Sequence, residues 1–183
     1  MKPRLKRHIV LIGMMGAGKT ALGTELSRRL RVPFTDSDAE IESAAAMSIS
    51  EIFARDGEPF FRARETEVLG RILTGPRGVI STGGGAWMRA ENRSLIAGTG
   101  VSVWLNAELD TLWHRVRLRP TRPLLQTADP RGTLERLLAE RNPVYAQADV
   151  NFAVQRADTI DQSTDRLIEA LRRHDPDLYQ DGK

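Results

Sequence analysis

Short, mostly apolar runs recur along the chain between glycine, proline and polar residues. Apolar runs of about four to eight residues are typical of strands that are covered on both faces of a sheet. We therefore expect strands at residues 8–12, 78–81, 101–105 and 150–154, with a shorter strand at residues 32–35.

The segments between these strands carry leucine and isoleucine at the spacing of an amphipathic helix. The three predicted stripes consist of Leu22, Leu26 and Leu30, of Leu134, Leu137 and Leu138, and of Ile160, Leu167, Ile168 and Leu171. We expect Asp158 to cap the third helix, because a carboxylate at this position accepts hydrogen bonds from the first helical N–H groups. Helices therefore alternate with strands along the chain.

Alternating strands and helices favour a mostly parallel sheet, because each helix carries the chain back over one face before the next strand. The predicted architecture is a three-layer α/β fold with helices on both faces of the sheet. The length suits a single domain, residues 1–183, with its core at residues 8–173. The polar residues 174–183 are expected to fray.

Composition and charge remove several classes of protein. The chain has no cysteine, which excludes disulfides, thiolate metal sites and cysteine nucleophiles, and this favours the cytoplasm. No stretch approaches the roughly 20 apolar residues of a membrane helix, so we expect no association with a membrane. The net charge is +3, but the arginines are spread along the chain without a block of basic and aromatic residues, so we expect no nucleic-acid partner.

The sequence GMMGAGKT, residues 13–20, follows the first predicted strand and precedes the first helical stripe. It matches the pattern G-x-x-x-x-G-K-[ST], in which backbone N–H groups and a helix N-terminus hold phosphate oxygens. In such a P-loop, Lys19 reaches the β- and γ-phosphates and Thr20 offers its hydroxyl to Mg²⁺. The flanking strand and helix favour a nucleotide-binding loop over an ordinary glycine turn, and the Asn-Lys-x-Asp element of GTPases is absent from the sequence.

Two carboxylates follow the short predicted strand in the sequence Asp36-Ser37-Asp38. Residues two apart on an extended segment point to the same side, so both side chains would face the space beyond the P-loop. One carboxylate would support Mg²⁺, and the other would accept a hydrogen bond from the hydroxyl of an acceptor. The alternative is a pair that caps the following helix, and one residue can serve both purposes.

Three further segments carry candidate binding residues. Arg62 and Glu65 are three residues apart on a predicted helix, where such a pair is usually a surface salt bridge. The glycine run, residues 83–85, ends a predicted strand and either admits a ligand close to its N–H groups or forms a flexible turn. Arg141 falls on the apolar stripe of its helix, and an inward arginine favours an anion such as a carboxylate.

An arginine-rich segment contains Arg115, Arg117, Arg119 and Arg122 together with two prolines. Such a segment, at about residues 115–130, is typical of a lid that closes over polyphosphate and excludes water. The alternative is a run of solvated charges on the surface.

Six motifs resemble those of the shikimate kinase family in both order and approximate spacing. They are GMMGAGKT, FTDSD, FFRARE, STGGG, TRPLL and RNPVY, and the resemblance extends from His8 to about Leu171. It implies a nucleoside monophosphate kinase-like fold with a five-stranded parallel sheet, a substrate-binding region and a lid. It also implies transfer of the γ-phosphoryl group of ATP to the 3-hydroxyl of shikimate, a step toward chorismate and the aromatic amino acids.

The resemblance further implies roles for individual residues. The catalytic residues would be Lys19, Asp38 and Arg122. ATP would be bound by Gly16, Ala17, Gly18, Lys19, Thr20, Ala21, Arg117 and Arg122, although both Arg115 and Arg117 remain candidates for stacking on adenine. Shikimate would be bound by Asp38, Phe53, Phe61, Arg62, Gly83, Gly84, Gly85 and Arg141. Mg²⁺ would be held by Thr20 and Asp36, and the family favours a monomer.

Two other functions fit parts of the sequence. A different small-molecule kinase of the same fold, such as a gluconate kinase, would share the P-loop and the inward arginines, but the Asp-x-Asp pair, the glycine run and RPLL favour shikimate. A nucleotide-binding module without catalysis would be expected to have lost some of the candidate residues.

Overall fold

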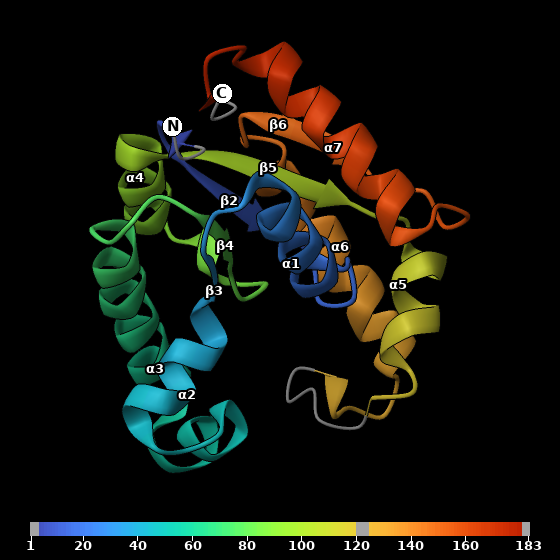
Figure 1. Ribbon diagram of the computed structural model, residues 1–183. Coiled ribbons are helices and arrows are strands. Elements are labelled where there is room, and N and C mark those ends of the chain that lie inside the picture. Colours follow the sequence, from blue (N-terminus) through green and yellow to red (C-terminus); the bar gives the residue numbers. More distant parts are fainter. Residues whose placement is uncertain (1–3, 120–124, 181–183) are drawn as a thin grey trace.

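Five parallel strands form the central sheet of the protein. The computed structural model describes residues 4–119 and 125–180, and Figure 1 shows the sheet between layers of helices. The strands are β2 (His8–Ile12), β3 (Phe34–Asp36), β4 (Val79–Ser81), β5 (Gly100–Asn106) and β6 (Val150–Ala153). Their spatial order is β3-β4-β2-β5-β6, and all neighbours pair in parallel. The predicted α/β fold with a five-stranded parallel sheet is confirmed.

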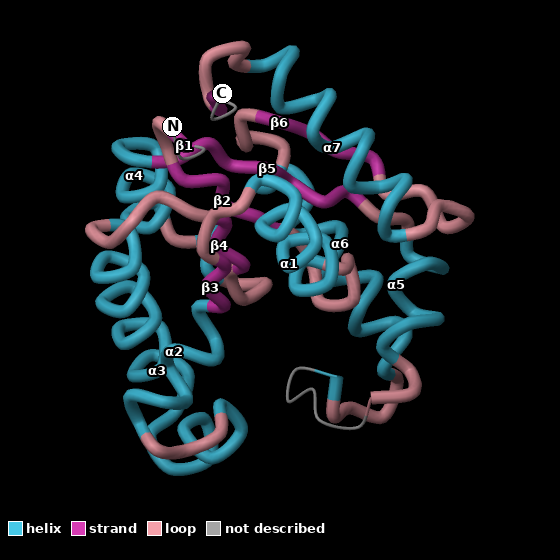
Figure 2. The backbone as a smooth tube through the Cα atoms, viewed as in Figure 1, coloured by secondary structure: helices cyan, strands magenta, loops and turns pink. Residues whose placement is uncertain are grey.

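Seven α-helices within the described residues surround this sheet. They are α1 (Lys19–Leu30), α2 (Ser37–Ala45), α3 (Ile49–Leu73), α4 (Ala90–Thr99), α5 (Leu109–Val116), α6 (Pro130–Tyr145) and α7 (Ile160–His174), with a short 3-10 helix, η1 (Ala86–Met88). Helices α1 and α7 pack together on one face, and α4 and α6 lie on the other. Figure 2 shows α2 and the adjoining half of α3 extending beyond one end of the sheet. No helix of the described chain is long and apolar enough to span a membrane.

The predicted apolar stripes of α1 and α6 face the core. Leu22, Leu26 and Leu30 are all buried in α1. In α6, Leu134 and Leu138 are buried and the third predicted leucine is partly buried. Removing a leucine side chain from water stabilises a fold by about 1.5–3 kcal/mol, so these stripes hold both helices against the sheet.

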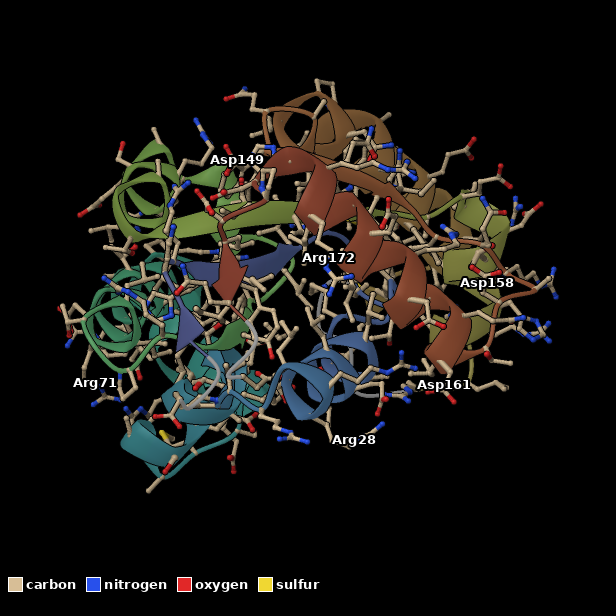
Figure 3. The ribbon with its side chains drawn as sticks, turned by 45° about the horizontal axis from the view of Figure 1, so that its top comes forward. Arg28, Arg71, Asp149, Asp158, Asp161 and Arg172 are labelled. Atoms are coloured by element: carbon tan, nitrogen blue, oxygen red, sulfur yellow. The ribbon has the colours of Figure 1, made fainter. Side chains whose placement is uncertain are left out.

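Helix α7 agrees with its predicted stripe at Leu167 and Leu171, which are buried, but not at Ile160, which is 47% exposed. Ile160 begins the helix and lines the opening of a large pocket instead of the core. The helix carries Asp161 in its first turn and Arg172 in its last, and Figure 3 shows the two at opposite ends. Both charges complement the helix dipole.

The N-terminal cap of α7 is Thr159, which corrects the prediction of Asp158. The Thr159 hydroxyl accepts a hydrogen bond from the Gln162 amide, and the Gln162 side chain accepts one from the Thr159 amide. This reciprocal pair is a capping box. Asp158 instead accepts a 2.9 Å hydrogen bond from Arg166, so its carboxylate fixes the loop that precedes the helix.

Helix α3 consists of two segments that meet at Gly57. This glycine has φ 82° and ψ 170°, which are not helical values, and Pro59 follows in the first turn of the second segment. The two segments and α2 enclose a small apolar cluster of Ile41, Ile52, Phe61 and Val68. This cluster stabilises the part of the chain that extends beyond the sheet.

The two ends of the described chain pair with each other. Strand β1 (Arg4–Leu5) is antiparallel to β7 (Tyr179–Gln180), and the Lys6 amide donates to the Leu178 carbonyl at 3.0 Å. Leu178 is 2% exposed. This corrects the prediction of a frayed tail as far as Gln180, because one apolar residue in a polar segment anchors it to the core.

His8 connects the start of β2 to two other elements. The Gly78 amide donates to its Nδ1 at 3.3 Å, which leaves the ring proton on Nε2, and Nε2 lies 3.2 Å from the Leu73 carbonyl. The residue is 1% exposed. Burial lowers the pKa of His8, although the hydrogen bond to the Leu73 carbonyl opposes the shift. The folded state therefore favours the neutral imidazole of His8 over the protonated form.

Acid should destabilise the protein through His8. Because the pKa is lower in the folded state, the unfolded chain binds a proton first as the pH falls below about 6.5, and the free energy of unfolding decreases. Thermal unfolding between about pH 7.5 and 5 should show a steeper loss of stability for the unchanged protein than for His8→Gln. Equal slopes would assign the acid sensitivity to other groups.

Candidate active site

The P-loop adopts a conformation that requires glycine. It connects β2 to α1, as predicted, and Gly13, Gly16 and Gly18 have φ of 139°, 81° and 96°. A Cβ on Gly16 would lie 2.7 Å from Val116 Cγ1, so the site excludes a side chain on steric grounds as well. The first turn of α1 contains no acidic residue, so its partial positive charge is available to an anion.

Lys19 folds back across this loop. Its Nζ donates to the carbonyl oxygens of Gly13 at 2.8 Å and Met14 at 3.0 Å. The same ammonium lines the larger of the pockets described below. These contacts hold the loop in shape and keep the positive charge beside the α1 N-terminus.

Thr20 and Asp36 meet at the end of β3. The Thr20 hydroxyl donates to Asp36 Oδ2 at 3.2 Å. Asp36 Oδ1 accepts hydrogen bonds from the amides of Asp38 at 2.9 Å and Ala39 at 3.2 Å, so Asp36 is the N-cap of α2. The capping alternative is therefore correct for Asp36, and the oxygen facing Thr20 is still directed toward the P-loop.

Asp38 is a carboxylate in an unfavourable environment. Its Oδ1 is buried and has no hydrogen-bond partner among the described residues. Burial raises the pKa of Asp38 to about 6, with further contributions from the negative charges of Asp36 and Glu65, while Lys19 and Arg62 act in the opposite direction. Such a carboxylate is ionised at neutral pH and accepts a proton readily.

Two adjoining pockets open at the carboxyl ends of the strands. The larger, about 1780 Å³, lies beside the P-loop and residues 114–119. The smaller, about 540 Å³, lies between α3, the glycine run and α6. Both are lined by Met15, Asp38, Gly83 and Gly84, so the pockets meet at the Asp38 carboxylate.

The structure brings most of the predicted binding residues to these pockets. The predicted substrate residues that line the smaller pocket are Asp38, Phe53, Phe61, Arg62, Gly83, Gly84, Gly85 and Arg141. The predicted nucleotide and metal residues that line the larger pocket are Gly16, Gly18, Lys19, Thr20, Ala21 and Asp36. Two of the predicted nucleotide-binding residues, Ala17 and Arg117, do not line this pocket. The side chain of Ala17 is buried, and Arg117 Nη2 lies 3.4 Å from His114 Nδ1.

The Arg62–Glu65 pair is part of the smaller pocket, which excludes the interpretation as a surface salt bridge. Arg62 Nη1 donates to Glu65 Oε2 at 2.9 Å, and Glu65 is 0% exposed. Glu65 Oε1 is without a partner among the described residues, and burial raises the pKa of Glu65 despite the nearby Arg62. Arg62 Nη2 also donates to Oε1 of Glu58, an exposed second partner, at 3.3 Å. The spacing identified the pair, but not the side of the helix that it occupies.

Arg141 points inward, as predicted from its place on the apolar stripe. It is 7% exposed, and its Nη1 lies 3.9 Å from Met14 Sδ. A Cβ on Gly84 would lie 3.3 Å from the same nitrogen, and a Cβ on Gly85 would lie 2.4 Å from Arg62 Nη2. The glycine run is therefore not only a flexible turn, because side chains there would displace both arginines.

The structure distinguishes the two arginines that the sequence left open, Arg115 in the last turn of α5 and Arg117 just after it. Arg115 Nη1 donates to the Gly16 carbonyl at 3.0 Å, and both Arg115 and Arg119 line the larger pocket. Arg122 belongs to residues 120–124, which lie outside the described part of the chain. Leu118 and Ile160, both exposed, add apolar surface to the same pocket.

Three comparisons with known proteins all match this chain to shikimate kinases. The family model of shikimate kinase matches residues 15–172. The shikimate kinase of Cereibacter sphaeroides is 58% identical over 178 residues, which cover 97% of this chain and 88% of the relative. The structure of a shikimate kinase from Acinetobacter baumannii in complex with shikimate is 35% identical, covers 91% of this chain and 92% of that one, and superposes with a TM-score of 0.83.

A gluconokinase from Sinorhizobium meliloti shares the fold but is more distant. It is 19% identical, with a TM-score of 0.59 over 93% of this chain and 94% of that one, so the likeness concerns architecture alone. The family match, by contrast, spans residues 15–20 of the P-loop, both pockets and α6. The chain belongs to the shikimate kinase family.

Proposed function

We propose that the two adjoining pockets divide the two substrates of this ATP-dependent shikimate kinase. The larger pocket takes the nucleotide, and the smaller takes shikimate. The observation that carries the assignment is the Asp38 carboxylate, which lines both pockets at the place where they meet. Phosphoryl transfer needs an acceptor hydroxyl in line with the γ-phosphate, and a boundary residue is suited to hold that hydroxyl.

In the larger pocket, the P-loop N–H groups and the α1 N-terminus would bind the ATP phosphates. Lys19 would exchange its carbonyl partners for phosphate oxygens, which are stronger acceptors because they are charged. Arg115 is the better candidate for the adenine, since it lies against the P-loop whereas Arg117 turns toward His114. Arg122 remains the proposed lid residue that closes on the phosphates.

Thr20 and Asp36 fit a magnesium site. A hydroxyl and a carboxylate oxygen 3.2 Å apart face the larger pocket, and the described residues contain no cluster of three or more acidic or histidine side chains that would form an all-protein metal site. Mg²⁺ is usually held in kinases by one or two protein oxygens together with substrate phosphates. When bound, the ion neutralises charge on the phosphates.

In the smaller pocket, Arg62 and Arg141 would bind the shikimate carboxylate, and Phe53 and Phe61 would contact its ring. The two phenyl rings lie 4.8 Å apart, and both face the pocket. Planar guanidinium groups bind carboxylates with paired hydrogen bonds. An anion is also favoured because the glycine run leaves its backbone close to the pocket without side chains.

Asp38 would accept a hydrogen bond from the 3-hydroxyl of shikimate and take its proton as the phosphoryl group is transferred. Its pKa of about 6 leaves the carboxylate ionised at neutral pH. The positive charge of Lys19 and the lid arginine would stabilise the charge that spreads over the transferred group. We also propose a monomer as the working unit, as the family resemblance favours, with the cytoplasm, where ATP is available, as its compartment.

The acceptor can be tested directly by ADP release from MgATP. We expect release with shikimate and not with gluconate, a nucleoside monophosphate or no acceptor. Asp38→Asn should reduce turnover by about 10²–10⁴-fold, because general-base catalysis typically contributes that much. Release with gluconate alone would favour the other kinase of this fold, and the absence of any acceptor-dependent release would favour a nucleotide-binding module without catalysis.

The choice between Arg115 and Arg117 is testable by substitution. Arg115→Ala should raise the KM for ATP by about 3–30-fold, which corresponds to the usual strength of an arginine stacked on an aromatic ring. Arg117→Ala is the matched control and should change this KM by less than about twofold. The reverse order of effects would restore Arg117 as the adenine residue.

The activity should decrease in acid because Asp38 must be ionised. The value of kcat/KM for shikimate reports the free enzyme, so it should fall about tenfold per pH unit below a midpoint near 6. Glu65→Gln should move this midpoint to lower pH, because it removes a negative charge that raises the Asp38 pKa. A midpoint that does not respond to Glu65→Gln would indicate that another group controls the profile.

A further inference from the structure

Tyr145 is a wholly buried residue whose polar atom lies against the substrate pocket. It ends α6 and is 0% exposed. Its ring stacks on Trp104, with centroids 6.0 Å apart and an angle of 24° between the planes. Its hydroxyl donates to the Gly84 carbonyl and lies 3.7 Å from Met14 Sδ. The ring packs in the hydrophobic core, whereas the hydroxyl is directed at the glycine run.

The Tyr145 hydroxyl is protonated at neutral pH and acts as a hydrogen-bond donor. Burial raises the pKa of Tyr145 to about 12, although the positive charge of Arg141 opposes the shift. The phenol has a single proton, and a carbonyl oxygen is a much better acceptor than a thioether, so the Gly84 carbonyl receives it. The hydroxyl and Arg141 Nη1 also lie 3.7 and 3.9 Å from the same Met14 Sδ, so the two side chains meet at this sulfur.

This contact determines the direction of a peptide group in the pocket wall. The described residues contain no cis peptide bond, so the carbonyl of Gly84 and the N–H of Gly85 point in opposite directions. Since the carbonyl points at Tyr145, the Gly85 N–H points away from α6. Glycines have no side chain that would hold the backbone by packing, so an external contact is needed to select one orientation.

A second contact shows that α6 holds the same loop at another point. The Trp87 indole N–H donates to the Val144 carbonyl at 2.9 Å, one residue before Tyr145. The Ala86 amide closes the turn onto the Gly83 carbonyl at 3.2 Å. The indole contact fixes η1, whereas only the phenol contact reaches Gly84. The orientation of the Gly84–Gly85 peptide therefore depends on Tyr145 among the contacts described.

We propose that Tyr145 is a positioning residue of the shikimate site, where its buried hydroxyl orients the Gly84–Gly85 peptide. Tyr145 does not line the pocket itself, so it acts through this peptide group. The proposal rests on the assignment of the smaller pocket to shikimate. It explains why a tyrosine, and not an apolar residue, occupies a fully buried position at the end of α6.

Tyr145→Phe tests this role because it keeps the ring and its stacking on Trp104 but removes the hydroxyl. The buried Gly84 carbonyl would lose its partner, and such a loss is worth about tenfold in an equilibrium that depends on the peptide orientation. We expect the calorimetric Kd of shikimate, measured without nucleotide, to rise about tenfold. The KM for ATP should change by less than about twofold. A purely structural hydroxyl would lower the melting temperature and leave both values unchanged.

Two control variants separate this proposal from the assignment of the pocket. Tyr179→Phe alters the other tyrosine of the chain, in β7 far from the pocket, and should leave the shikimate Kd unchanged. Arg141→Lys should weaken shikimate binding by at least about tenfold, because an ammonium cannot replace a paired guanidinium contact. If Arg141→Lys weakens binding and Tyr145→Phe does not, the positioning role is overturned; if neither does, the pocket assignment fails as well.

If Tyr145→Phe is unstable, the proposal can be tested by fluorine NMR on the protein that keeps Tyr145. The chain has two tyrosines, so incorporation of 3-fluorotyrosine gives two fluorine resonances, which Tyr179→Phe assigns. The Tyr145 resonance should shift when shikimate is added and remain in place when ATP alone is added. An unchanged Tyr145 resonance at saturating shikimate would overturn the proposal.

Discussion

The parallel register of β2 with both of its neighbours determines where the active site forms. Leu11 pairs with Ser81 of β4 on one side and with Val103 of β5 on the other. Strands in parallel register end at the same edge, so the P-loop after β2 and the glycine run after β4 emerge side by side. The larger and smaller pockets adjoin for this reason, and Asp38, which follows the edge strand β3, reaches the boundary between them.

The smaller pocket holds more charge than a protein interior usually accepts. Arg62 and Arg141 face Asp38 and Glu65, and one oxygen of each carboxylate is without a partner among the described residues. An unsatisfied buried polar atom costs about 1–3 kcal/mol, more if charged, so this arrangement lowers the stability of the fold. The apolar stripes of α1 and α6 and the closely packed sheet offset that cost elsewhere. Under the proposed assignment of this pocket, the carboxylate and hydroxyl groups of shikimate would supply the missing partners.

The sequence was sufficient for features that depend on neighbouring residues in the chain. The five strands, the P-loop and the inward direction of Arg141 all follow from local pattern. The burial of Glu65 did not, because it depends on which side of α3 faces the glycine run. The same limit applies to Tyr145, whose partner Gly84 is 61 residues away in the sequence. The N-cap of α7 is Thr159 and not the predicted Asp158, because the backbone geometry at two adjacent residues decides which side chain caps the helix.

The break in α3 at Gly57 has a consequence for the wall of the smaller pocket. Phe53 lies before the break and Phe61 after it, yet the two rings form one wall of the smaller pocket. Their separation is therefore governed by the φ and ψ angles of a single residue without a side chain, and not by the rigid geometry of a continuous helix. A change of the backbone at Gly57 would therefore move one phenyl ring relative to the other and alter the width of the pocket.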